Sequence, residues 1–129
     1  MRISVDSGSI EGDLVVPDGA RGIVVFAHGS GSSRHSSRNK HVAAVLQASG
    51  LGTLLFDLLT AAEESLDERT RVLRFNIGLL AQRLVAVTDA LEDAPSAQGR
   101  PVGYFGASTG AAAALVAAAD RPAVRAIVS

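Results

Sequence analysis

Short runs of apolar residues alternate along the chain with longer polar or amphipathic segments. The clearest are IVVFA at 23–27, LGTLLF at 51–56 and VGYF at 102–105. They are almost continuously apolar and show no alternation of apolar and polar residues. This pattern is typical of strands buried on both faces of a parallel sheet. The final run, AVRAIVS at 123–129, predicts one more strand of the same kind.

The first residues follow a different pattern. RISV at 2–5 and GDLVVP at 12–17 are two β-prone runs, and the intervening DSGS segment is rich in residues that favour tight turns. Two such runs joined by a short polar segment predict an antiparallel hairpin.

Three helices are expected between the strands. The first runs from Ser36 or Ser37 to Ser49, with a serine cap, an apolar face of Val42, Val45 and Leu46, and Gly50 at its end. The second follows an acidic loop at 57–68 and is capped by Asp67. Its apolar residues recur every three or four positions, and they are Leu73, Ile77, Leu80, Leu84, Val87 and Leu91. The third is the alanine-rich run at 111–119.

This order of elements predicts the fold class. Strands that alternate with helices indicate an α/β fold with a mostly parallel sheet covered by helices on both faces, here preceded by the N-terminal β-hairpin. The 129 residues are enough for one compact domain, so residues 1–129 are taken as a single α/β domain. Ligands of such sheets collect beyond the carboxyl ends of the strands.

Charge and composition exclude several function classes. Twelve basic and thirteen acidic residues nearly balance, which gives no general attraction to nucleic acid or to a membrane surface. The chain has no cysteine, so disulfides and thiolate metal sites are ruled out. The three histidines, His28, His35 and His41, fit no standard zinc spacing. The first residues lack the apolar core of a signal peptide, and we expect a cytoplasmic protein.

Two glycine-rich turns fall at the carboxyl ends of predicted strands. GASTG at 106–110 fits the G-x-S-x-G pattern in which a strained strand-to-helix turn lifts a serine hydroxyl above the sheet. Ser108 would then be a nucleophile, and the alternative is a structural turn serine. Gly106 and Gly110 would be required because side chains there would collide with neighbouring backbone.

The other turn, HGSGSS at 28–33, has three interpretations. Its backbone N–H groups, together with that of Thr109, could form an oxyanion hole. Alternatively, Gly29 and Gly31 could begin a dinucleotide-binding loop with Asp57 as the ribose-binding acid, but Arg34 stands where that fingerprint needs a third glycine. The third interpretation is a plain connection.

Taken together, these segments resemble a known family. GIVVFAHGSGSSRHSSRNKHVAAVLQASGLGTLLFDLLT followed by VGYFGASTGAAAALVAAA is similar to the N-terminal half of an α/β-hydrolase of the dienelactone-hydrolase-like group. The resemblance implies that Ser108 is the nucleophile and that the backbone amides of Ser30 and Thr109 form the oxyanion hole. It also implies that His28 shapes the turn with Gly29 and is not the general base. Dienelactone hydrolase itself uses a cysteine nucleophile, whereas this chain has a serine.

The resemblance has consequences for activity. It implies a serine hydrolase acting on a small ester-like substrate, and acyl transfer by serine requires no cofactor. In this fold the acid and the histidine follow the nucleophile along the chain, but only Asp120 and no histidine follow Ser108. We therefore expect the acid and the base to be missing from residues 1–129, and the isolated chain to be weakly active or inactive.

Other interpretations of the same residues remain open. Asp57 could orient His28 as a local base. The 123–129 strand would leave an open sheet edge, so the chain could instead be a non-catalytic half-domain that self-associates or binds a complementing C-terminal segment. His35 and His41 are expected at the surface, and Arg34, Arg38 and Lys40 at a solvated helix terminus. The acids are expected in a solvated loop and helix start, and they are Glu63, Glu64, Asp67 and Glu68.

Overall fold

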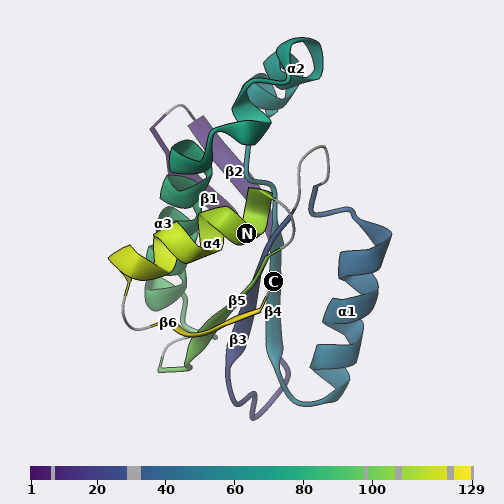
Figure 1. The fold of residues 1–129 in the computed structure, drawn as a ribbon. Helices are drawn as coiled ribbons and strands as arrows, with labels where there is room; N and C mark the ends of the chain where they lie inside the picture. Colours follow the sequence, from purple (N-terminus) through teal and green to yellow (C-terminus); the bar gives the residue numbers. More distant parts are fainter. Residues whose placement is uncertain (7, 29–32, 98, 107–108, 122–123, 129) are drawn as a thin grey trace.

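Within the described residues, six strands form one sheet in the order β1-β2-β4-β3-β5-β6 in the computed structural model (Figure 1). The structure describes residues 1–6, 8–28, 33–97, 99–106, 109–121 and 124–128. The strands are β1 (Arg2–Val5), β2 (Gly8–Val15), β3 (Ile23–Ala27), β4 (Gly52–Phe56), β5 (Val102–Gly106) and β6 (Val124–Val128).

The sheet is mostly parallel, as the sequence predicts. β4, β3, β5 and β6 are parallel to one another, whereas β2 is antiparallel to both β1 and β4. The predicted hairpin is present, although β2 begins at Gly8, which pairs with Val5. β4 is buried along its whole length, which agrees with its continuous apolar sequence.

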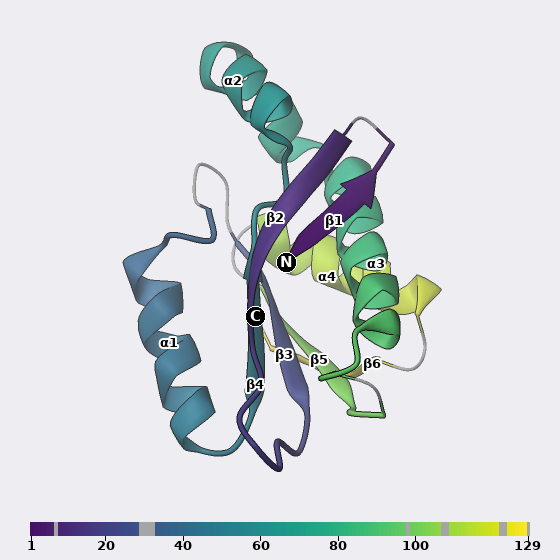
Figure 2. The same cartoon turned by 180° about the vertical axis from the view of Figure 1, so that it is seen from behind.

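Helices cover both faces of the sheet (Figures 1 and 2). α1 (Ser37–Ala48) lies on one face, while α3 (Ile77–Asp93) and α4 (Thr109–Asp120) pack against each other on the other face. The main core lies under α3 and α4 and includes Val25, Leu54 and Tyr104. The predicted α/β architecture is therefore confirmed.

α1 matches its predicted bounds. The Ser36 hydroxyl caps it by accepting a hydrogen bond from the backbone N–H of Asn39. Val42 and Leu46 pack on a small cluster of Phe26, Ala43 and Leu55. The expectation that Val45 also faces the core is wrong, because this side chain is 52% exposed.

The segment after β4 differs from the prediction of an acidic loop followed by a helix capped by Asp67. It forms α2 (Ala61–Thr70) and a short 3-10 helix, η1 (Leu73–Phe75), before α3 begins. Thr60 and Glu63 make a capping box in which each side chain accepts a hydrogen bond from the other's backbone N–H. α2 ends where Arg71 adopts a left-handed conformation with φ of 59°. Figure 1 shows α2 projecting beyond the end of the sheet.

The predicted apolar stripe is correct for α3 itself. Asn76, not Asp67, caps this helix by accepting from the N–H of Leu79. The stripe residues buried on the helix are Leu80, Leu84, Val87 and Leu91. α4 presents Ala113, Ala114 and Ala117 to the core with no exposed surface, so small side chains allow close packing of this helix.

Candidate active site

The carboxyl ends of β3 and β5, called their exits below, lie side by side. Ala27 and Gly106, the last residues of these strands, pair in register. His28 follows the first strand, and Thr109 and Gly110 begin α4 after the second. The predicted nucleophile Ser108 and the turn residues Gly29 and Ser30 lie outside the described residues. The residues that border both turns nevertheless converge at one place.

The two glycines of the G-x-S-x-G pattern make this convergence sterically possible. A Cβ atom on Gly110 would overlap the carbonyl oxygens of Ala27 and His28, the latter at 2.5 Å. A Cβ atom on Gly106 would lie 2.7 Å from Cα and 2.9 Å from N of Ala111. Real Cβ atoms do not approach backbone this closely. The first turn of α4 can therefore pack on the end of β3 only without a side chain at Gly110, and on the end of β5 only without one at Gly106. The collision expected from the sequence is therefore present.

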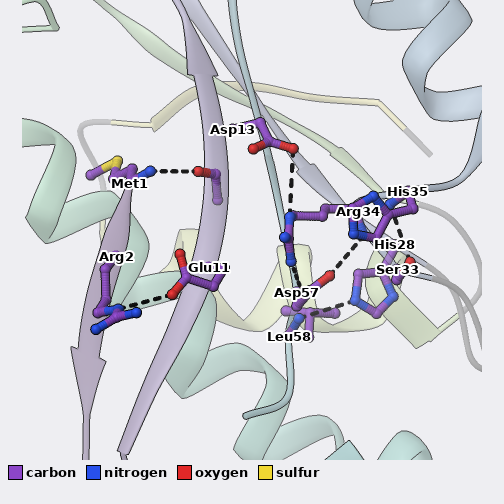
Figure 3. Close-up of polar contacts among 11 residues, drawn as sticks. Met1, Arg2, Glu11, Asp13, His28, Ser33, Arg34, His35, Asp57 and Leu58 are labelled. Atoms are coloured by element: carbon purple, nitrogen blue, oxygen red, sulfur yellow. Dashed lines mark hydrogen bonds and ion pairs between the residues drawn. The ribbon is translucent and has the colours of Figure 1, made fainter. Parts of the chain in front are cut away.

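His28 is fixed to the exit of the neighbouring strand β4. Its side chain is buried, and Nε2 accepts a hydrogen bond of 3.0 Å from the backbone N–H of Leu58 (Figure 3). This bond requires that Nε2 carry no proton. One ring nitrogen is thus already engaged, which favours a structural part for His28 after β3.

Asp57, the last residue before Leu58, binds Arg34. Its Oδ1 accepts a 2.9 Å hydrogen bond from the Arg34 backbone N–H, and its Oδ2 forms an ion pair with the guanidinium (Figure 3). The alternatives in which Asp57 orients His28 or binds a ribose lose support, because both carboxylate oxygens already have a partner.

The sequence prediction of a solvated basic cluster is wrong for Arg34. Besides Asp57, its Nε lies 3.5 Å from a carboxylate oxygen of Asp13 on β2. Only Arg38 and Lys40 of that cluster are exposed. His35 and His41 are exposed as predicted.

A cleft of about 660 Å³ opens between the N-terminal hairpin, residues 33–35 and α2. Acidic and basic side chains are part of its wall, and they are Arg2, Glu11, Arg34, His35, Asp57, Glu64 and Glu68. Arg2 and Glu11 pair across the hairpin at 2.9 Å, while Arg34 is held by Asp57 and Asp13. The cleft therefore adjoins one border of the glycine turn at 29–32.

The sequence interpretation missed two acids with structural partners. The two carboxylate oxygens of Glu63 accept hydrogen bonds of 2.6 and 2.7 Å from the Arg83 guanidinium on α3. Arg83 is 5% exposed. Asp67 accepts from the backbone N–H and Nε of Arg74 at 3.0 and 2.8 Å. Burial by itself would raise the pKa of Asp67, but the hydrogen bonds from Arg74 outweigh burial and the pKa is lowered. The T-x-x-E spacing of Thr60 and Glu63 was the available signal for the capping box.

Solved structures with a similar fold include α/β-hydrolases. A dienelactone hydrolase from Anabaena variabilis is 62% identical, with a TM-score of 0.95 over 98% of this chain and 59% of its own. Est1E from Butyrivibrio proteoclasticus is 18% identical, with a TM-score of 0.78 over 98% of this chain and 48% of its own. The chain thus corresponds to part of a dienelactone-hydrolase-like α/β-hydrolase fold, and the predicted resemblance is confirmed.

Curated relatives carry a different name. Two Mycobacterium tuberculosis proteins, from strains CDC 1551 and H37Rv, are 62% identical over 121 residues and are provisionally named phosphoribosyl transferases. The match covers 93% of this chain but 26% of each relative. No protein-family profile matches the chain. Among the described residues, no helix has the length and apolar character needed to cross a bilayer.

Proposed function

We propose that this chain supplies the nucleophile and the oxyanion-binding amides of a cytoplasmic serine hydrolase that cleaves small ester-like substrates. Ser108 attacks the substrate carbonyl, and the backbone N–H groups of Ser30 and Thr109 stabilise the negative charge that develops on its oxygen. No cofactor takes part. The supporting observation is the contact of Gly110 with the carbonyls of Ala27 and His28, which joins the borders of both glycine turns.

Similarity to dienelactone hydrolase supports a hydrolase over a transferase. The identity is 62% in both comparisons, but the chain accounts for 59% of the hydrolase and only 26% of the proteins named as transferases. A name given to a protein about four times as long can describe activity elsewhere in that protein. Asp57, the residue that could bind a ribose, is already engaged by Arg34.

We infer that the catalytic acid and base lie in residues outside these 129, and a chain that contains both parts is called the full-length protein below. His28 is unsuited to be the base because its Nε2 accepts from Leu58. A serine hydroxyl without a base is a poor nucleophile at neutral pH. We therefore expect the isolated chain to hydrolyse activated esters weakly or not at all, and the full-length protein to do so efficiently.

A fluorophosphonate probe tests this function. The full-length protein is incubated with the probe, and the adduct is located by peptide mass spectrometry, with the Anabaena dienelactone hydrolase as a comparison. We expect one adduct, on Ser108, that is lost in Ser108→Ala and retained in Ser33→Ala, the matched control in the same site region. Labelling of another residue, or none under conditions that label a typical serine esterase, contradicts the proposal.

A non-catalytic half-domain is the second candidate. It is supported by the position of β6 at the end of the strand order, where β5 is its one partner among the described residues. Leu115 and Val116 on the nearby helix α4 are 62% and 47% exposed. Such an edge can pair with a second copy or a complementing segment. Light scattering combined with an esterase assay distinguishes the half-domain from the hydrolase. A dilute monomer with esterase activity excludes the half-domain, whereas an inactive dimer supports it.

A further inference from the structure

Residues 61–75, which comprise α2 and η1 and are called the arm below, carry apolar side chains that the rest of the protein does not cover. Figures 1 and 2 show α2 projecting beyond the end of the sheet. Leu66, Val72 and Phe75 are 43%, 65% and 61% exposed. Single exposed apolar side chains are normal on a protein surface, but three within one projecting segment indicate a surface that a partner covers.

The arm is held in one orientation by two ion pairs. At its base, the carboxylate of Glu63 binds the Arg83 guanidinium on α3 at 2.6 and 2.7 Å. Farther along, Asp67 accepts hydrogen bonds of 3.0 and 2.8 Å from the backbone N–H and Nε of Arg74, which ties η1 to α2. A surface that is already ordered loses little conformational entropy on binding. The arm is therefore suited to docking as a rigid unit.

Charge is segregated along the arm. Residues 61–68 contain four acids and no base, whereas residues 69–75 contain three arginines and no acid. This order suits the helix dipole of α2, but the dipole does not account for the exposed apolar side chains. Four charged side chains form no ion pair or hydrogen bond with another described residue, and they are Glu64, Glu68, Arg69 and Arg71.

We propose that the arm binds the arm of a second copy of this chain in antiparallel orientation. A two-fold axis across the arm places residues 61–68 of one copy against residues 69–75 of the other, so opposite charges meet in both halves of the interface. A parallel arrangement would place like charges side by side and is disfavoured. The exposed apolar side chains of both copies then lie between the charged ends and lose their contact with water.

This interface differs from pairing at the edge strand β6. Strand pairing is made by backbone hydrogen bonds, which do not depend on the sign of side-chain charges, whereas the arm interface does. Dimerisation through the arm also does not require the proposed hydrolase activity. Labelling of Ser108 and formation of the dimer are measured separately, so failure of one leaves the other to be judged by its own result.

Sedimentation of the full-length protein tests the proposal through charge reversal. We expect a dimer with a dissociation constant of about 1–100 μM, in keeping with a small interface. Glu64→Lys combined with Glu68→Lys makes the arm basic, and Arg69→Glu combined with Arg71→Glu makes it acidic. Like charges then meet in each homodimer, and the dissociation constant should rise at least about tenfold. An equimolar mixture of the two variants restores opposite charges and should dimerise within about threefold of the original constant.

Phe75→Ser tests the apolar part of the interface. It should raise the dissociation constant at least about tenfold, because a large aromatic side chain no longer leaves water on dimerisation. Val45→Ser is the matched control, since Val45 is 52% exposed and lies on α1, outside the arm. The control should change the constant by less than about twofold.

Loss of the dimer in each charge-reversed variant and its recovery in the mixture support the proposal. A full-length protein that stays monomeric at about 100 μM overturns it. A dimer that the charge reversals and Phe75→Ser leave unchanged also overturns it, because its interface then lies elsewhere, as at β6. A mixture that stays monomeric has the same consequence. If a charge-reversed variant does not fold, the comparison of Phe75→Ser with Val45→Ser decides in its place.

Discussion

The exits of β5 and β4 fix the adjoining backbone by opposite means. After β5, Gly106 and Gly110 have no side chain, and the start of α4 rests directly on the carbonyls at the end of β3. After β4, the backbone is held by polar partners: Asp57 binds Arg34, and Leu58 binds His28 and Arg83. Sterics determine the first exit, whereas ionisation and hydrogen bonding determine the second.

This difference has a physical consequence for what each exit tolerates. A contact made by backbone alone is destroyed by a single added methyl group but does not depend on pH. Backbone held by polar partners tolerates small changes in side-chain volume. It loses this support when one partner loses its charge, because a buried polar group is then left unsatisfied. Three measurements separate the two kinds of exit.

The largest effect is expected for Gly110→Ala. The new Cβ would overlap two carbonyl oxygens, so either β3 or α4 must move, and we expect a loss of at least about 3 kcal/mol in the free energy of unfolding, at the upper end for overpacking. Gly78→Ala is the matched control, because Gly78 is also the second residue of a helix and its Cβ would meet only Asn76 Oδ1, at 3.7 Å. The control should be neutral or stabilising by up to about 1 kcal/mol. Urea unfolding measures both; equal losses would contradict the steric account.

A somewhat smaller effect is expected at the polar exit for Glu63→Gln. It leaves the buried Arg83 guanidinium without its carboxylate, and breaking such a pair costs about 3 kcal/mol. The control is Asp89→Asn, because Asp89 also binds one arginine, Arg121, through two hydrogen bonds of 2.7 Å. That pair is exposed, with 36% and 47% of the side-chain surfaces accessible, and its loss should cost less than about 1 kcal/mol. Similar losses in thermal or urea unfolding would refute the importance of burial.

The smallest effect on stability is expected when the pH is lowered. Hydrogen bonds from Arg74 lower the pKa of Asp67 below its ordinary value of 3.8, despite burial. A lowered pKa means that this carboxylate stabilises the fold above the unfolded-state value and that its contribution is lost as pH falls through the folded-state value. Below about pH 4, the protection factor of the Arg74 amide should fall before those of the amides in the middle of α4 do. Asp67→Asn should remove this pH dependence, and a parallel fall in both regions would count against the distinction.

The sequence predicted the steric exit better than the polar one. Continuous apolar runs identified β3, β4 and β5, and the spacing of two glycines around a serine indicated where side chains are forbidden. Local sequence carries that information, because each glycine contacts backbone whose position follows from the strand-helix connection. The N-cap of α1 was also correct because Ser36 acts three residues away.

The polar exit was harder to predict for a physical reason. Arg34 and Asp57 are 23 residues apart, and Glu63 and Arg83 are 20 apart. Their pairing depends on which strands are adjacent, so neither sequence pattern nor composition reveals it. The acidic composition of 57–68 suggested a solvated loop, although the capping box of Thr60 and Glu63 was visible in the sequence. Aspartate is a residue type that often caps helices, but Asp67 lies within α2 and binds Arg74.

The most direct test of the proposed acyl-transfer site is a crystal structure of the full-length protein after reaction with a fluorophosphonate. The account predicts phosphorus bonded to Oγ of Ser108, with the phosphoryl oxygen about 2.7–3.1 Å from the backbone nitrogens of Thr109 and Ser30. A phosphonate on another residue, or a phosphoryl oxygen directed away from both amides, would contradict it.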